Sequence, residues 1–159
     1  MLDPNFPQQA LKICMNNSVS PEYIELELTE SVFIRDEKAA LRALNTLKEN
    51  GFRLSLDDFG SGFSSLSYLR SFQFEVVKVD KSLIQGIHLD SKANALFNGL
   101  IAMLKSLQIE VVAEGVELES YLPFMQQADI QLMQGFYFES SMLFLNLFQT
   151  LHNLLLCIY

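Results

Sequence analysis

Apolar positions recur along the chain with two different periods. Residues 23–29 alternate apolar with polar, as a strand with one buried face does, whereas residues 5–17 and 89–107 repeat apolar positions every three to four residues, as an amphipathic helix does. Read in this way, the sequence predicts strands at 23–29, 52–56, 76–79, 109–113 and 131–138. It predicts helices at 5–17, 36–50, 64–72, 89–107 and 119–128.

Strands and helices therefore alternate five times along the chain. Such alternation is typical of α/β proteins, in which parallel strands are joined by right-handed helical crossovers. Five units suit either a doubly wound sheet or part of a (β/α)8 TIM-like barrel. A whole barrel needs about 250 residues, and this chain has 159. If it is a barrel, about five of its units are present, open or completed by self-association.

Composition indicates which kinds of protein and binding partner are compatible with this chain. Half of the residues are apolar and 19% are charged, which indicates one globular domain. The net charge of -8 argues against a nucleic-acid polymer as partner. Cys14 and Cys157 lie far apart in apolar segments, so we expect free thiols in a reducing cytoplasm. The first residues lack the basic and apolar regions of a signal peptide.

Polar residues gather where the predicted strands end. Glu27 and Lys78 lie inside otherwise apolar strands, and burying an unpaired charge costs several kcal/mol. We therefore expect these two side chains to find charged partners at a common pocket, because the carboxyl ends of parallel strands meet at one edge of a sheet. The polar residues at this edge are Glu27, Glu30, Asp57, Asp58, Lys78, Asp80, Glu114, Glu117 and Gln134.

The pair Asp57-Asp58 stands at the centre of this set. On its own, an Asp-Asp pair before Gly60 and Gly62 is explained by turn chemistry. An acid-rich ring with one lysine, however, suits hard divalent cations such as Mg²⁺ or Mn²⁺. Two such ions could activate a water and offset the charge of a phosphodiester, while Lys78 holds that water or a phosphate oxygen. We expect the pair where the strand gives way to a loop.

Five motifs, in this order and spacing, resemble the EAL-type cyclic-di-GMP phosphodiesterase domain. The resemblance covers roughly residues 2 to 140, so we assign residues 1–141 to such a domain. It implies a bacterial cyclic dinucleotide pathway, a modified (β/α)8 barrel, Mg²⁺ or Mn²⁺ as cofactor and cyclic-di-GMP as substrate. The motifs are Glu-Leu-Thr-Glu-Ser at 27–31, Asp-Asp-Phe-Gly-Ser-Gly-Phe-Ser-Ser-Leu at 57–66, Val-Lys-Val-Asp at 77–80, Ala-Glu-Gly-Val-Glu at 113–117 and Gln-Gly-Phe-Tyr-Phe at 134–138.

The resemblance also implies roles for single residues. Asp57 would bridge two metal ions, and Glu30 would steady the loop that follows the acidic pair, with Glu117 as a further anchor. The implied metal ligands are Glu27, Asp57, Asp58 and Glu114. The implied catalytic residues are Lys78, Glu114 and Gln134, and the implied dimer loop contains Phe59, Gly60 and Phe63. His88 and His152 are isolated, and we interpret neither as a ligand or base.

The chain also departs from the family pattern. The Glu-Ala-Leu segment and the strand whose asparagine completes the first metal site are absent, which leaves out roughly three of the eight strands. Strand edges left open invite pairing, so we expect a homo-oligomer, or a tail helix that folds over the exposed face. The apolar tail at 142–159 predicts a helix that packs on the domain rather than a membrane span.

Three functions are compatible with this sequence. The first is an inactive remnant of a phosphodiesterase, favoured by the missing ligands. The second is an active enzyme whose missing strands come from another chain, favoured by the ligands that remain. The third is a non-catalytic regulatory module that binds a protein partner through residues 59–66 and the tail.

Overall fold

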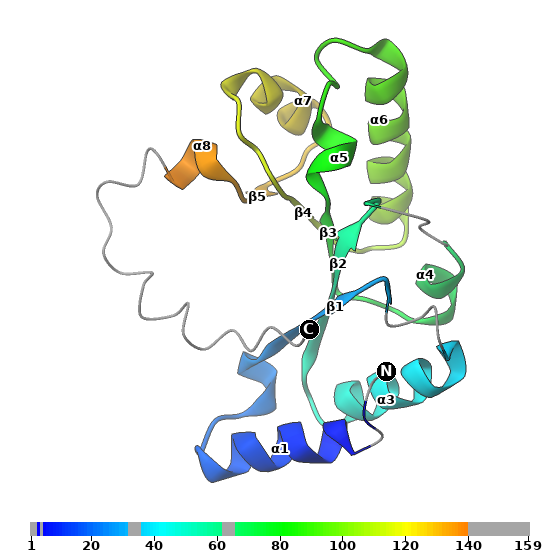
Figure 1. Cartoon of the computed structure of the whole chain (residues 1–159), viewed down its shortest axis with the longest axis vertical. Coiled ribbons are helices and arrows are strands. Elements are labelled where there is room, and N and C mark those ends of the chain that lie inside the picture. Colours follow the sequence, from blue (N-terminus) through cyan, green and yellow to red (C-terminus); the bar gives the residue numbers. More distant parts are fainter. Residues whose placement is uncertain (1–2, 4, 32–35, 62–65, 140–159) are drawn as a thin grey trace.

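Five parallel strands form one sheet in the order β1-β2-β3-β4-β5 (Figure 1). The structure is a computed structural model that describes residues 3, 5–31, 36–61 and 66–139. The predicted α/β class, with strand-helix units like those of a partial barrel, is confirmed. The strands are β1 (Glu25–Thr29), β2 (Arg53–Phe59), β3 (Val76–Val79), β4 (Glu110–Ala113) and β5 (Leu132–Met133).

The helices begin where the sequence supplies a cap. The carboxylates of Asp36, Asp80 and Asp90 each accept a hydrogen bond from a backbone N–H in the first turn that follows. Two of these helices were predicted, and the short α5 after Asp80 was not. The helices are α1 (Phe6–Asn16), α3 (Glu37–Glu49), α4 (Ser67–Ser71), α5 (Lys81–Ile84), α6 (Ser91–Ser106), α7 (Leu122–Gln127) and α8 (Phe136–Glu139), with 3₁₀ turns η1 (Pro21–Tyr23) and η2 (Glu119–Tyr121).

The two faces of the sheet differ in chemistry. One face packs against helices, as Figure 1 shows for α3, α4 and α6, and its strand residues share a buried core with helix residues such as Leu44 and Phe97. Its strand residues are Leu26, Leu28, Leu54, Leu56, Val77, Val79, Val111 and Ala113. Successive side chains of a strand point to opposite faces, so the other face carries Glu27, Asp57 and Lys78.

The acidic pair lies inside a strand rather than after one. Strand β2 continues through Asp57 and Asp58 to Phe59, and its register against β3 shifts between Leu56 and Phe59. Asp58 has a φ of 56° at this irregularity. The expectation that the strand ends before the pair is therefore wrong, because pairing with β3 resumes beyond a bulge.

The last strand is much shorter than predicted. Strand β5 contains Leu132 and Met133 only, and the following residues turn into α8. Val116 explains the difference, because its N–H donates to the carbonyl of Gln134 and its carbonyl accepts from the N–H of Tyr137. A Cβ at Gly135 would collide with the backbone of Val116. These contacts tie residues 134–137 to Val116, and α8 begins at Phe136 where a longer strand was predicted.

Two of the sequence predictions fall wholly or partly outside the described residues. The predicted tail helix at 142–159 lies outside them, as does the start of the predicted helix at 64–72. Among the helices that the structure describes, none is long and apolar enough to cross a membrane.

Candidate metal centre

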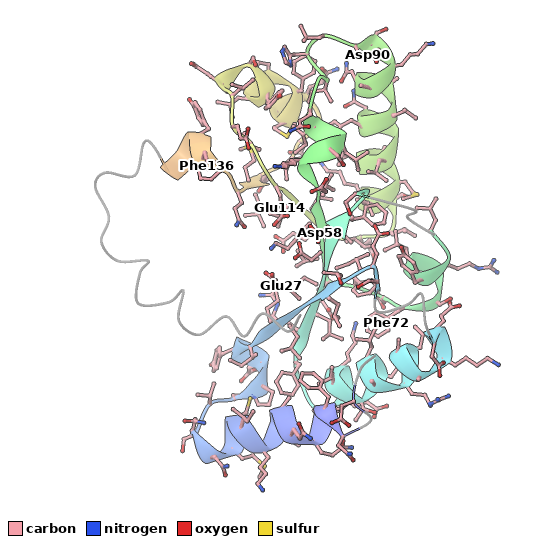
Figure 2. The ribbon with its side chains drawn as sticks, in the orientation of Figure 1. Glu27, Asp58, Phe72, Asp90, Glu114 and Phe136 are labelled. Carbon is pink, nitrogen blue, oxygen red and sulfur yellow. The ribbon has the colours of Figure 1, made fainter. Side chains whose placement is uncertain are left out.

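Four strands contribute charged side chains to one region of the polar face. Glu27 comes from β1, Asp57 and Asp58 from β2, Lys78 from β3, and Glu114 from the residue after β4. Figure 2 shows Glu27, Asp58 and Glu114 around the middle of the sheet. The gathering of these residues follows from the parallel order of the strands, which the sequence predicted.

Three carboxylates come closest together. Asp57, Asp58 and Glu114 each offer an oxygen, and these atoms all lie within 4.8 Å of one another. Hard divalent cations take carboxylate oxygens as ligands and keep water in their other positions. The donor set therefore fits Mg²⁺ or Mn²⁺, the cofactors that the sequence indicated.

Lys78 is the cation that the structure places among these acids. Its Nζ lies 2.8 Å from Glu114 Oε1, 3.0 Å from Glu27 Oε1 and 3.7 Å from Asp57 Oδ1. Burial lowers the pKa of Lys78, but its hydrogen bonds to Glu114 and Glu27 outweigh burial and raise that pKa above its ordinary value. Lys78 therefore stays charged at neutral pH and acts as a hydrogen-bond donor.

Two of the carboxylates hold their protons more tightly than usual. Burial raises the pKa of Glu114, and the neighbouring Asp57 and Glu27 add to that effect against the attraction of Lys78. Burial and the charge of Asp57 raise the pKa of Asp58. The Lys78–Glu114 contact thus favours the charged lysine, while burial and, to a smaller extent, the neighbouring acids disfavour the charged glutamate. A divalent cation would relieve this repulsion between carboxylates.

Glu27, predicted as a metal ligand, lies beside the group of three carboxylates and contacts the same lysine. Its carboxylate contacts Lys78 and is outside the group of three whose oxygens converge. The structure thus pairs the two charges that were predicted to need partners in apolar strands. Whether Glu27 also binds metal stays a prediction.

Glu30 contacts the turn after the acidic pair. Its Oε1 accepts a hydrogen bond from the N–H of Gly60 at 3.0 Å, and its Oε2 accepts one from the hydroxyl of Tyr68 at 2.8 Å. This geometry suits the steadying role that the resemblance implies. The sequence did not predict the hydrogen bond from Tyr68, because the two residues are 38 positions apart and no motif connects them.

Two other predicted site residues, Glu117 and Gln134, have exposed side chains and are not among the three converging carboxylates. The backbone of Gln134 is fixed, because its N–H donates to the carbonyl of Ala113 at 2.8 Å. Their roles as anchor and catalytic residue stay predictions.

The predicted dimer loop is only partly accessible. The side chain of Phe59 is 1% exposed and belongs to the core. Its ring packs on the helix-covered side of β2, and the role of this loop in a dimer stays a prediction. Gly60 follows it at a φ of 94°, and Phe63 lies outside the described residues.

Comparison with known proteins decides the family. The EAL domain profile matches residues 1–141. The chain belongs to the EAL domain family. An uncharacterized signaling protein of Caulobacter vibrioides is 41% identical over 134 residues, which cover 84% of this chain and 17% of that protein.

Solved EAL structures have the same arrangement of elements. The PaMucR phosphodiesterase in complex with c-di-GMP matches with a TM-score of 0.75 and 32% identity, over 85% of this chain and 57% of that one. A manganese and cy-diGMP complex of Klebsiella pneumoniae BlrP1 matches with a TM-score of 0.77 and 32% identity, over 84% and 34%. The chain thus spans less than two thirds of the length of each of these three proteins.

Proposed function

We propose that this chain carries the acidic half of the metal centre of a cyclic-di-GMP phosphodiesterase. The observation that carries the proposal is the convergence of Asp57, Asp58 and Glu114 within 4.8 Å, with Lys78 beside them. Support comes from the similar PaMucR and BlrP1 structures, which were solved with c-di-GMP, the latter also with manganese.

In this proposal each residue has a chemical task. Asp57, Asp58 and Glu114 would hold a divalent cation, which when bound supplies Lewis-acid polarisation of a phosphate oxygen and activation of water. Lys78 donates hydrogen bonds to a water or a phosphate oxygen, because its raised pKa keeps it protonated. Glu27 holds the Lys78 ammonium from the β1 side at 3.0 Å. Gln134 would contact the same water.

The open sheet limits what the chain does by itself. Strands β1 and β5 are the edges of the five-stranded sheet in the described part of the chain. We propose that further strands, from a longer protein or another copy, complete the substrate site, and that the edges self-associate without them. We therefore expect the 159-residue chain alone to bind metal and to turn over cyclic-di-GMP slowly or not at all.

We also propose a cytoplasmic location. Cys14 is a buried free thiol, and thiols persist in reducing compartments.

One experiment separates metal binding from turnover. The purified chain is titrated with Mn²⁺ by calorimetry and then incubated with cyclic-di-GMP and Mn²⁺, with chromatography to detect the linear dinucleotide. We expect Mn²⁺ binding that Asp57→Asn abolishes and that Glu119→Gln, which changes an exposed acid of η2, leaves unchanged. A wild-type chain that binds no Mn²⁺ would refute the proposed metal centre.

The turnover measurement then distinguishes a catalytically active chain from an inactive one. Conversion of cyclic-di-GMP that Asp57→Asn removes would assign activity to the chain or its oligomer, and sedimentation would identify which. Absence of conversion together with Mn²⁺ binding is the result we expect for an incomplete barrel.

A further inference from the structure

The carboxylate of Glu30 joins two segments that lie on either side of residues 62–65. Glu30 directly follows β1, and each of its oxygens accepts a hydrogen bond. The N–H of Gly60 donates to one oxygen at 3.0 Å, and the hydroxyl of Tyr68, in α4, donates to the other at 2.8 Å. Glu30 thereby ties helix α4 to the peptide that follows Asp57-Asp58-Phe59.

This peptide needs support from outside the strand. Asp58 has a φ of 56°, a conformation that is uncommon for residues other than glycine and persists only where neighbouring structure fixes it. The register of β2 against β3 shifts at the same place, so ladder hydrogen bonds do not fix it. The direction of the Asp58 side chain therefore depends on what holds the chain on either side.

Several contacts hold the chain after Asp58. The carbonyl of Phe59 accepts from the N–H of Asp80 at 3.0 Å, and a Cβ at Gly60 would collide with the side chain of Leu83. These contacts come from the start of α5. The Glu30 contact approaches from the β1 side, and its acceptor is charged. A charged acceptor makes stronger hydrogen bonds than a neutral one.

Tyr68 constrains the orientation of that acceptor. A hydrogen bond to the second oxygen of a carboxylate limits its rotation about the side-chain bonds. The Tyr68 ring is 5% exposed and packs in the core, so its hydroxyl is itself held in place. A hydroxyl anchored in the core therefore presents the Glu30 carboxylate to Gly60.

We propose that Tyr68 is a positioning residue of the metal centre. Acting through Glu30, it holds the Gly60 peptide and so keeps Asp58 where its oxygen meets those of Asp57 and Glu114. The inference rests on the proposed function, since it assigns a further residue to the same centre. Tyr68 itself touches neither metal nor substrate.

The first test is the Mn²⁺ affinity of the whole chain with Tyr68→Phe, measured by electron paramagnetic resonance titration. The variant keeps the buried ring and loses the hydroxyl. We expect the affinity to fall roughly tenfold, the low end of the range for residues that hold metal ligands in place. Tyr121→Phe is the matched control, because Tyr121 is 6% exposed and edge-stacks on His88. It should leave the affinity unchanged.

The second test measures, without metal, whether Tyr68 affects the hydrogen bond between Glu30 and the Gly60 N–H. Hydrogen exchange of the Gly60 amide, followed by nuclear magnetic resonance, should become several-fold faster in Tyr68→Phe and stay unchanged in Tyr121→Phe. In a Glu30→Ala background, Tyr68→Phe should add no further loss of Mn²⁺ affinity, since Tyr68 acts through Glu30.

The outcomes separate this inference from the proposed function. If the wild-type chain binds Mn²⁺ and Tyr68→Phe binds it equally well, Tyr68 is not a positioning residue, although the metal centre stands. Unchanged exchange of the Gly60 amide overturns the inference in either case. A wild-type chain that binds no Mn²⁺ overturns both. Equal losses in Tyr68→Phe and Tyr121→Phe would mean that general packing, rather than the Glu30 contact, is responsible.

Discussion

The polar face of the sheet carries two clusters in which one cation lies among acids, and they differ in depth. Toward the carboxyl ends of the strands, Lys78 contacts Glu114 at 2.8 Å and Glu27 at 3.0 Å, and the Lys78 side chain is 11% exposed. At the amino ends, Arg53 lies 3.8 Å from Glu25 and 4.0 Å from Glu110, and its side chain is 52% exposed.

Charge alone therefore does not mark the candidate site. Both clusters have acids from β1 and from β4 or the residue after it, with a basic residue between them. Solvent screens the Arg53 cluster, so its ion pairs contribute little. The Lys78 cluster crowds three carboxylates around a lysine whose side chain is largely buried. Burial, with a smaller contribution from the neighbouring acids, raises the pKa of Glu114 there. Crowding and burial are what prepare a site for a divalent cation.

The largest expected difference between the clusters is in metal affinity. Glu114→Ala should weaken Mn²⁺ binding by about a hundredfold or more, because even the outer partners of metal ligands are worth 10- to 100-fold. Glu110→Ala removes an acid of β4 from the exposed cluster and should change the affinity less than about twofold. Calorimetric titration measures both, and equal losses would show that the two clusters are not distinct.

The second difference is in stability without metal. Lys78→Met leaves partly buried carboxylates without their cation and should lower the free energy of unfolding by about 2 kcal/mol, below the range for fully buried pairs. Arg53→Met should cost no more than about 0.5 kcal/mol. Urea unfolding measures both values. A Lys78→Met variant as stable as Arg53→Met would contradict the difference in burial. Saturating Mn²⁺ should recover part of the loss.

The smallest expected effect is the pH dependence of the metal-free chain. The raised pKa of Glu114 means that the folded chain binds its proton more tightly than the unfolded chain does. Stability from this group is therefore full below the ordinary pKa of 4.5 and is lost as the pH rises through the raised value. The urea concentration at the midpoint of unfolding should therefore increase as the pH falls from 7 through the raised pKa of Glu114.

Two variants isolate the contribution of Glu114 to this trend. Glu114→Gln should flatten the dependence, whereas Glu110→Gln should retain it. An equally steep dependence in Glu114→Gln would assign the effect to other groups, among them Asp58, whose pKa is also raised.

The sequence by itself determined the order of the elements and the edge at which charges meet. Strand β3 lies at Val76–Val79, where its apolar run predicted it, and α3 begins after Asp36 as its cap predicted. Periodicity and capping are local properties, and alternating strands and helices allow few topologies. The prediction that Glu27 and Lys78 need charged partners is confirmed by their contact.

Only the tertiary structure decided which groups contact one another within that edge. It placed Asp57 and Asp58 inside β2 at a bulge, buried the ring of Phe59, shortened β5 against Val116 and brought Tyr68 to Glu30. Each of these features depends on a partner outside the local pattern: residue Tyr68 lies 38 positions from Glu30. The local sequence determines which strand or helix a residue belongs to and which face its side chain is on. The packing of other segments determines the direction in which that side chain points. The metal centre depends on these directions, because its carboxylate oxygens must converge.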